Sequence, residues 1–410
     1  MPASFNTPDG ESLASARSAM FTTYAPPELV FERGEGPYLY DIHGEAYLDF
    51  IAGIAVSALG HSHPRLEQAL IEQAKKVWHV SNLFRVPQGE SLAKRLAELS
   101  GLDRVFFTNS GTESVECGLK MMRRYHYDHG APERNRIIGA HSAFHGRTFA
   151  AICAAGNPAH VKGFVRDDEG YDHVPFNDLE AVEAAITEKT AGIIVEPIQG
   201  EGGIGVAEKA YLQGLRTLAD KHNILLMFDE VQCGVGRTGQ FYAAEYFGVR
   251  PDIIASAKGL GGGFPVGACI ANEKVASSMV VGTHGSTYGG NPLAMRVAAE
   301  VVEIISDKQF LRSVTEKGEK LKQGLLALCE DFPTVIDGVR GVGLMLGLHC
   351  VQDNGNTDLL VAARTNKLLL GKAGDNVVRL LPPLIIDESH IAEALEKLRL
   401  SLHGLAQGQS

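Results

Sequence analysis

Short apolar runs that do not alternate with polar residues recur along the chain and restrict the folds open to it. They are "RVFFTN" (104–109), "AGIIVEPI" (191–198) and "NILLMFDE" (223–230). Runs of this kind are typical of strands that are buried on both faces of a sheet. Helical patterns, such as those over 91–100 and 211–222, lie between them. Because strands alternate with helices, the sequence predicts an α/β fold with a mainly parallel central sheet.

The pattern changes near residue 300. A long helical stretch there leads into two β-rich segments, 340–350 and 376–386, and a further helical pattern follows. We expect a large ligand-binding domain over residues 65–300 and a smaller α+β domain over residues 301–410. A turn-rich strand section precedes them, and we expect the N-terminal segment, residues 1–64, to join the smaller domain.

Charge and cysteine usage exclude several functions. The net charge is −11, which disfavours binding to nucleic acid or to an anionic membrane. The cysteines are scattered without a CxxC pair, which argues against a zinc site or a disulfide framework and fits a reducing compartment. No apolar run approaches about 18 residues, and acidic residues near the start argue against a transit peptide. We therefore expect a cytoplasmic enzyme with neither a nucleic-acid nor a membrane partner.

Polar residues follow the predicted strands at Ser110, Glu196 and Asp229. In parallel α/β sheets, ligands bind beyond the carboxyl ends of the strands, so these side chains are candidates for a site. A further candidate is Lys258, the lone charge in "IIASAKGLGGGFPVG" (253–267). An ammonium in such an apolar, glycine-rich setting loses hydration, which lowers its pKa and favours a nucleophilic neutral amine.

The segment "FFTNSGTES" ends a predicted strand and begins a helix at Ser110, Gly111 and Thr112. Free backbone N–H groups and two hydroxyls at that place form an anion site, although a plain Ser/Thr N-cap explains the same pattern. The acid at Asp229 equally fits a strand end that faces water. An anion cradle, a strand-end acid and then Lys258 is the order that pyridoxal phosphate requires for its phosphate, its pyridine nitrogen and its Schiff base.

Two other motifs are weaker indicators of function. The dinucleotide pattern GxGxxG occurs at 200–205 and 234–239, which keeps an NAD-dependent oxidoreductase as a remote alternative. Acidic residues and a proline near these glycines make the match poor. The histidines of "HSHP" (61–64) and "HSAFH" (141–145) lack further ligands at metal spacing. We expect no metal, and read these histidines as satisfied or solvent-facing.

The chain resembles the class III (ω-type) aminotransferases among the fold-type I pyridoxal-phosphate enzymes, and within them the acetylornithine/succinylornithine aminotransferase subfamily. The resemblance rests on "LDFIAGIAVSALGHSHP", "FFTNSGTES", "AFHGRT", "IIVEPIQGEGG", "FDEVQCGVGRTG", "AKGLGGGFPVGA", "GTHGSTYGGNPLA" and "NVVRLLPPL", in this order over nearly the whole chain. It implies the fold of that group, with the cofactor in the large domain. It departs from the usual pattern at Cys233 and in "SGTESVECGLK" (110–120).

The resemblance implies a role for each residue that matches a family motif. Lys258 would be the Schiff-base lysine and Asp229 the partner of the pyridinium, and these two would be the catalytic residues. The other cofactor-binding residues would be Ser110, Gly111, Thr112, Phe144, Gln232 and, from the neighbouring subunit, Thr287. The substrate-binding residues would be Arg147, Glu201, Ser286 and Arg379, with Glu201 pairing Arg379 when no α-carboxylate is bound.

The resemblance further implies a homodimer with shared active sites and a ping-pong transfer of a terminal amino group to 2-oxoglutarate. We expect N-acetylornithine or succinylornithine as the amino donor, in arginine metabolism. Ornithine and 4-aminobutyrate remain alternatives, as does a binding or scaffold protein that keeps the fold without the reaction. Ornithine aminotransferases carry a tyrosine where this chain has Ile54, and an apolar wall there gives a free ammonium no partner.

Overall fold

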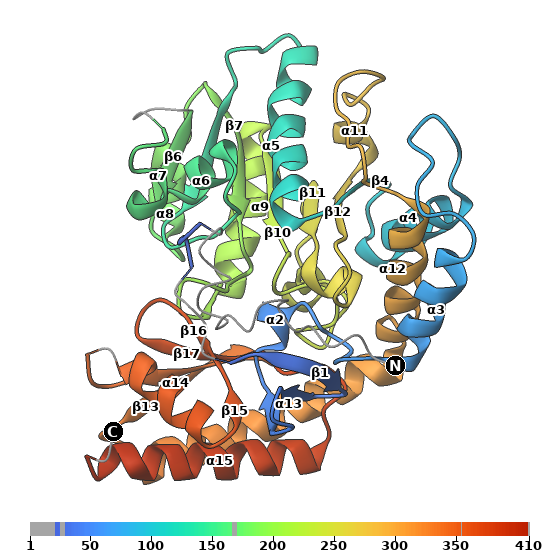
Figure 1. Ribbon diagram of the computed structural model, residues 1–410. Helices are drawn as coiled ribbons and strands as arrows, with labels where there is room; N and C mark the ends of the chain where they lie inside the picture. The colour runs from blue at the N-terminus through green and yellow to red at the C-terminus, as the bar shows by residue number, and fades with distance from the viewer. Residues whose placement is uncertain (1–20, 25–28, 166–169, 354, 409–410) are drawn as a thin grey trace.

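A central sheet organises the computed structural model, which describes residues 21–24, 29–165, 170–353 and 355–408 (Figure 1). Its strands run in the order β4 (Arg104–Thr108), β12 (Gly267–Ala271), β11 (Ile253–Ser256), β10 (Leu225–Asp229), β7 (Thr190–Val195), β5 (Arg136–Ala140) and β6 (Tyr171–Val174). Strand β12 is antiparallel to both of its neighbours, and the other pairs are parallel. This confirms the predicted α/β fold with a mainly parallel sheet.

The sheet is covered by apolar side chains on both faces, as the uninterrupted apolar runs predicted. In β10, Leu226 and Phe228 join one core cluster, while Leu225 and Met227 join the other. Helix α9 (Lys209–His222) packs on the first face and α5 (Gly111–Asp128) on the second. Burying a large aliphatic side chain contributes roughly 1.5–3 kcal/mol, so the two clusters hold the strand ends in fixed positions.

Two further sheets lie below the central sheet in the view of Figure 1. One runs in the order β1 (Phe31–Glu35), β2 (Tyr38–Asp41), β3 (Ala46–Asp49) and β15 (Leu368–Leu369), and its β3–β15 pair is parallel. The other is antiparallel, in the order β13 (Ile336–Val342), β14 (Met345–Cys350), β17 (Val377–Leu380) and β16 (Gly371–Lys372). The β3–β15 pair therefore ties the first part of the chain to the last.

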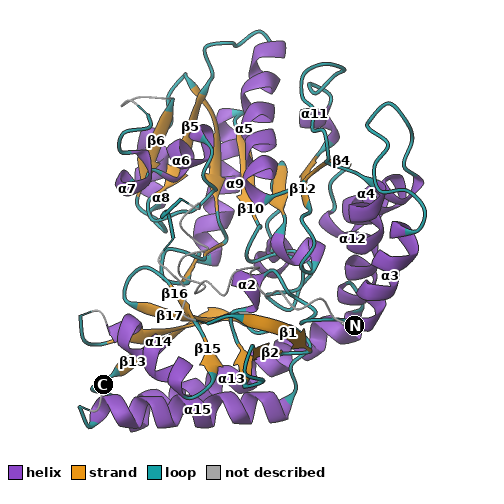
Figure 2. Cartoon of the chain, viewed as in Figure 1, coloured by secondary structure: helices purple, strands orange, loops and turns teal. Residues whose placement is uncertain are grey.

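Helices cover these sheets and connect them to the central one (Figure 2). Helices α13 (Lys308–Asp331), α14 (Gly355–Thr365) and α15 (Glu388–Ala406) pack on the lower sheets. Helices α3 (Pro64–Ala74), α4 (Pro87–Ser100) and α12 (Pro292–Ile305) form a group beside the central sheet. The shorter elements are α6 (Phe149–Ala155), α7 (Pro158–Val161), α8 (Leu179–Ala185), β8 (Ile198–Gln199), β9 (Gly205–Val206), α10 (Ala243–Phe247), η2 (Lys258–Gly261) and α11 (Glu273–Ala276). Among the described residues, no helix combines the length and the apolarity needed to cross a membrane.

A left-handed turn stands where the chain passes from β3 towards α3. In α2 (Ala52–Ala55), every residue has a positive φ between 48° and 63°. Ile54 has φ 63°, and the left-handed conformation costs a non-glycine residue roughly 1–2 kcal/mol. The turn contacts η2, the short helix that begins at Lys258. Strained backbone conformations are common at functional sites, so the region beside η2 is a candidate for one.

Candidate active site

A cavity of about 250 Å³ opens beyond the carboxyl ends of the central strands. It lies where the parallel-sheet argument placed a ligand site. It brings together residues from five motifs that are distant in the sequence. The lining residues are Gly111, Thr112, Phe144, His145, Gly146, Arg147, Glu196, Asp229, Val231, Gln232 and Lys258.

Lys258 enters the cavity from the first position of η2, directly after β11. Its backbone φ is 46°, so the chain turns sharply there. Burial lowers the pKa of its ammonium, and the carboxylates of Glu201 and Asp229 oppose this only in part. Within the described part of the chain, the Lys258 side chain makes no ion pair or hydrogen bond. A desolvated, unpaired amine is suited to attack a carbonyl carbon.

Asp229 ends β10 with its carboxylate in the cavity. One carboxylate oxygen accepts from the backbone N–H of Val231 at 3.0 Å, and the other lies 2.7 Å from His145 Nδ1. Burial lowers the pKa of His145, but the hydrogen bond and charge of Asp229 outweigh it, so the net shift is upward. The next acid, Glu230, points elsewhere and caps α10 through the backbone N–H groups of Ala243 and Ala244.

The reading of His145 as a satisfied or solvent-facing histidine was therefore incomplete. The side chain is buried, and its partner Asp229 lies 84 residues away in the sequence, so no local pattern reveals the contact. Its Nε2 is buried without a hydrogen-bond partner among the described residues. We assign His145 to the site as the group that orients the Asp229 carboxylate and stabilises its charge.

Glu196 is a second buried acid in the cavity, at the end of β7. It accepts from the backbone N–H groups of Phe144 at 2.9 Å and Gly200 at 3.4 Å. Burial, and then the charge of Asp229, raise the pKa of Glu196 to about 7. The sequence marked it as a polar strand-end residue but gave it no role. It holds the loops that carry Phe144 and Gly200 against the sheet.

The start of α5 forms one wall of the cavity. A Cβ added to Gly111 would lie 2.6 Å from Val231, and one added to Gly146 would lie 2.1 Å from the Thr112 hydroxyl. Gly146 also has φ 127°, so these backbones approach in a way that side chains would block. Ser110 is the N-cap of α5 and accepts from the backbone N–H of Glu113 at 3.3 Å. Free helical N–H groups thus face the cavity at a glycine-lined helix start.

Phe144 and Arg147 also line the cavity. The Arg147 guanidinium lies over the Phe144 ring, 5.5 Å from its centroid. Arg147 is exposed, and no residue in the described ranges pairs with it as an anion. An unpaired guanidinium at the mouth of a cavity is a ready site for a carboxylate.

A buried guanidinium closes the side of the cavity near the lower sheets. Arg379, in β17, is 3% exposed and binds Glu201 through both terminal nitrogens, at 2.5 and 3.2 Å. It also donates to the Gly200 carbonyl at 3.2 Å and to Gln232 Oε1 at 3.3 Å. The structure thus brings together the predicted substrate residues Arg379 and Glu201 and the predicted cofactor residue Gln232.

Several predicted residues are not among those that line this cavity, namely Ser110, Glu201, Arg379, Ser286, Thr287 and Ile54. Ser286 and Thr287 lie in the loop between α11 and α12, where Ser286 bonds Asn109 and Gly289 and Thr287 is exposed. Ile54 is 40% exposed on α2 and reaches the site region through the contact between α2 and η2. Their roles in substrate or cofactor binding stay predictions.

Neither dinucleotide pattern forms a strand-to-helix phosphate turn. Residues 200–205 connect β8 to β9, and residues 234–239 lie in a run of turns.

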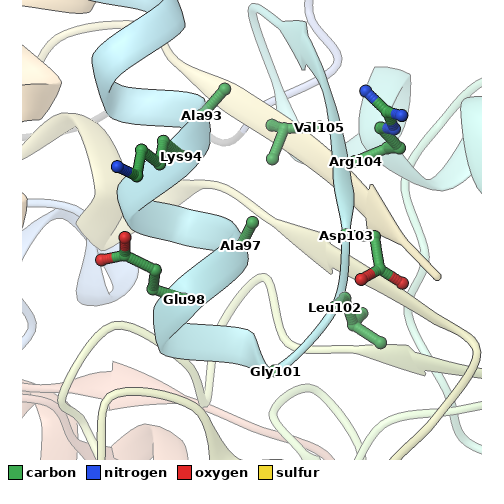
Figure 3. A pocket seen from close by; sticks show the side chains of 9 residues that line it. All are labelled: Ala93, Lys94, Ala97, Glu98, Gly101, Leu102, Asp103, Arg104 and Val105. Atoms are coloured by element: carbon green, nitrogen blue, oxygen red, sulfur yellow. The ribbon is translucent and has the colours of Figure 1, made fainter. Parts of the chain in front are cut away.

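A larger hollow, of about 690 Å³, lies between α4 and the start of β4 (Figure 3). Three of its charged groups are already engaged, because Arg104 pairs with Glu273, Asp103 accepts from the backbone N–H of Glu273, and Glu98 pairs with Arg95. It sits at the end of β4 opposite the lysine cavity.

Comparisons with known proteins agree with this arrangement. A family model for class-III aminotransferases matches residues 20–402. An acetylornithine aminotransferase from Mesorhizobium japonicum is 51% identical over 389 residues, covering 95% of this chain and 97% of the relative. The structure of N-acetylornithine aminotransferase from Stenotrophomonas maltophilia K279a has a TM-score of 0.83 and 36% identity, covering 94% of this chain and 98% of that chain. A structure of ornithine aminotransferase from Toxoplasma gondii, with partial occupancy of pyridoxal phosphate at its active site, has a TM-score of 0.91 and 31% identity, covering 97% and 94%.

Proposed function

The chain belongs to the class-III aminotransferase family, and from that membership we propose that it moves the terminal amino group of N-acetylornithine or succinylornithine to 2-oxoglutarate. The observation that carries the proposal is a single cavity that holds Lys258, Asp229 and an unpaired Arg147, with the Arg379–Glu201 pair joined to its lining through Gln232. A donor with a carboxylate remote from its reacting amine suits this layout.

Pyridoxal phosphate is the cofactor of this family, and the residues of the cavity fit it. The glycine-lined start of α5 offers N–H groups to a phosphate, Phe144 offers a flat face to a ring, and Asp229 offers a buried carboxylate to a ring nitrogen. Lys258 supplies the amine that binds the cofactor aldehyde. When bound, the cofactor supplies an electron sink that acidifies the carbon beside the substrate nitrogen.

The residues of the chain then divide the work. Lys258 would be the base that takes a proton from the substrate carbon and then returns it. The Asp229 carboxylate, which His145 and the Val231 N–H hold in place, would bind the ring nitrogen. Gln232, which faces the cavity, is placed to contact the cofactor's phenolic oxygen.

The two guanidinium groups would bind the two classes of substrate. Arg147 would bind the carboxylate that is remote from the reacting amine. Arg379 would bind the α-carboxylate of glutamate or 2-oxoglutarate, which would displace Glu201. With a terminal-amine donor no carboxylate reaches Arg379, and Glu201 would keep the buried charge paired. The pair would thus act as a switch between the two half-reactions.

We propose a homodimer with shared active sites as the functional unit. The loop between α3 and α4 and the loop between α11 and α12 both carry exposed apolar side chains, and Asn82 Nδ2 links them by donating to the Ser286 carbonyl. These side chains are Trp78, Leu83, Phe84, Val280, Val281 and Tyr288. An exposed apolar surface of this kind is typical of a protein–protein contact. A second copy seated there would receive Thr287 and Ser286 in its own site.

The same proposal includes the domain division and the location. The group formed by α3, α4 and α12 supports a large domain over residues 65–300. The β3–β15 pair supports joining the described part of residues 1–64 to the smaller domain over 301–410, while residues 1–20 and 25–28 lie outside the described residues. A cytoplasmic location is supported by Cys117, Cys233, Cys269 and Cys350, which are buried and form no disulfide.

A substrate panel tests the proposal. The values of kcat/KM for N-acetylornithine, succinylornithine, ornithine and 4-aminobutyrate should be measured under one condition, with 2-oxoglutarate as acceptor. We expect the two acylated donors to be preferred. If ornithine or 4-aminobutyrate exceeds both, the donor assignment is wrong although the transaminase remains. If no donor reacts, the chain keeps the fold for another purpose.

A further inference from the structure

A histidine outside the lining of the cavity stands next to its mouth. His160 lies in α7 (Pro158–Val161), a short helix whose N-cap Asn157 accepts from the backbone N–H of Ala159 at 2.9 Å. The His160 ring meets the Phe144 ring edge-on, with centroids 6.1 Å apart and an interplanar angle of 90°. The Arg147 guanidinium contacts the same Phe144 ring, so His160 and Arg147 share one aromatic support.

The surroundings of His160 leave one polar atom without a partner. Its Nδ1 is buried and makes no hydrogen bond to any residue that the structure describes. Burial, and then the positive charge of Arg147, lower the pKa of His160, and the carboxylate of Glu201 opposes them. The ring is therefore neutral at neutral pH, with one N–H to donate and one nitrogen to accept. A buried polar atom without a partner is costly unless a ligand supplies one.

The proposed donors have a group that belongs at this place. In an N-acylated amino acid, the acylated nitrogen is attached to the same carbon as the α-carboxylate. If Arg147 binds that carboxylate, the acyl amide lies within a few ångströms of Arg147, whose guanidinium shares the Phe144 ring with His160. A neutral imidazole can bind an amide through either its N–H or its free nitrogen, and the Phe144 ring offers an apolar surface to the acyl carbons.

We propose that His160 is a specificity-determining residue that recognises the acyl amide of the amino donor by a hydrogen bond. This inference rests on the proposed function, and in particular on Arg147 as the carboxylate site. A purely structural His160 would only pack on Phe144, and a side chain of similar size without polar atoms would replace it without loss of ligand affinity.

Binding to the loaded holoenzyme separates these roles, because ligands without a free amine do not react. N-acetylnorvaline keeps the carboxylate and the acyl amide, whereas glutarate keeps carboxylates without an amide. The two affinities should be measured by calorimetry for the wild type, His160→Leu and His160→Gln. Lys162→Leu, an exposed position at the end of the same helix, is the matched control.

We expect His160→Leu to weaken N-acetylnorvaline by about 2- to 12-fold, the range of one neutral hydrogen bond, and to leave glutarate unchanged. His160→Gln should recover part of the loss, and Lys162→Leu should change neither affinity. An equal loss for both ligands, or unchanged N-acetylnorvaline binding in His160→Leu, would overturn the proposal. Failure of the proposed function has a different signature, because the wild type itself would then bind N-acetylnorvaline no better than pentanoate, which has neither an amide nor an amine.

Discussion

Replacing Glu201 by alanine leaves Arg379 without its carboxylate partner. Arg379 is 3% exposed and would keep the Gly200 carbonyl and the Gln232 amide oxygen, neither of which carries a charge. The α-carboxylate of glutamate or 2-oxoglutarate would then bind Arg379 without first displacing Glu201. A terminal-amine donor would instead meet an unpaired guanidinium. Glu201→Ala should therefore favour the α-amino acid half-reaction and impair the terminal-amine half-reaction.

The magnitude follows from the exposure of the pair. Breaking a fully buried ion pair costs about 3–5 kcal/mol, and an exposed pair contributes about 0–1 kcal/mol. The side chains of Arg379 and Glu201 are 4% and 35% exposed, so this pair lies between the limits, at about 1–3 kcal/mol. At about 1.4 kcal/mol per tenfold, we expect the ratio of the two half-reaction efficiencies to change by roughly 5- to 140-fold.

The assay is single-turnover kinetics of each half-reaction, followed by the cofactor absorbance. Asp375→Ala is a matched control, because it removes an exposed carboxylate that pairs with Arg340 beside the same loop, at Gly203. The control should leave the ratio unchanged. Equal effects of Glu201→Ala on both half-reactions would refute the switch.

Three further predictions concern residues around the cavity. Hybrids of Lys258→Ala and Thr287→Ala subunits should regain activity, because one of their two shared sites would be wholly wild type; no recovery over the parents would place Thr287 in its own subunit's site. Ile54→Tyr should move the donor preference towards ornithine, and an unchanged preference would mean that other residues set the selectivity. Ile54→Gly should raise thermal stability, because glycine adopts the left-handed conformation of this position without strain. His145→Leu should lower activity by about 10- to 150-fold, because it removes a hydrogen bond to a charged group that contributes about 1.5–3 kcal/mol. His145→Asn should lose less activity. Equal losses in the two variants would argue that His145 does not orient Asp229.

The strands that build the site could be predicted from the sequence because their apolar runs record burial directly. Strand β10 begins and ends within two residues of the expected run, and its terminal Asp229 lies in the cavity as a strand-end acid should. The direction of β12 could not be predicted in this way. Its residues, Gly267–Ala271, are mostly small and apolar, and such a segment fits a parallel or an antiparallel neighbouring strand equally well.

Contacts between distant segments were the main features that the sequence did not reveal. His145 and His160 each contact residues from distant segments. The sequence around a histidine does not show whether its side chain lies in a functional site or in the core. The left-handed turn at Ala52–Ala55 was also missed, because alanine and isoleucine do not favour positive φ and tertiary packing must impose it. In contrast, the family motifs located Arg379 and Glu201 because they identify whole segments rather than single residues.

Peptide mapping after borohydride reduction tests the central claim most directly, namely that the cavity at the carboxyl ends of the central strands is the active site and that Lys258 is its reactive amine. The purified protein should be yellow, and reduction should fix the mass of the cofactor on the peptide that contains Lys258. Lys258→Ala should carry no adduct and should lose at least the ~10²–10⁴-fold that general acid–base catalysis contributes. An adduct on another lysine, such as the exposed Lys274 on α11, would contradict the account.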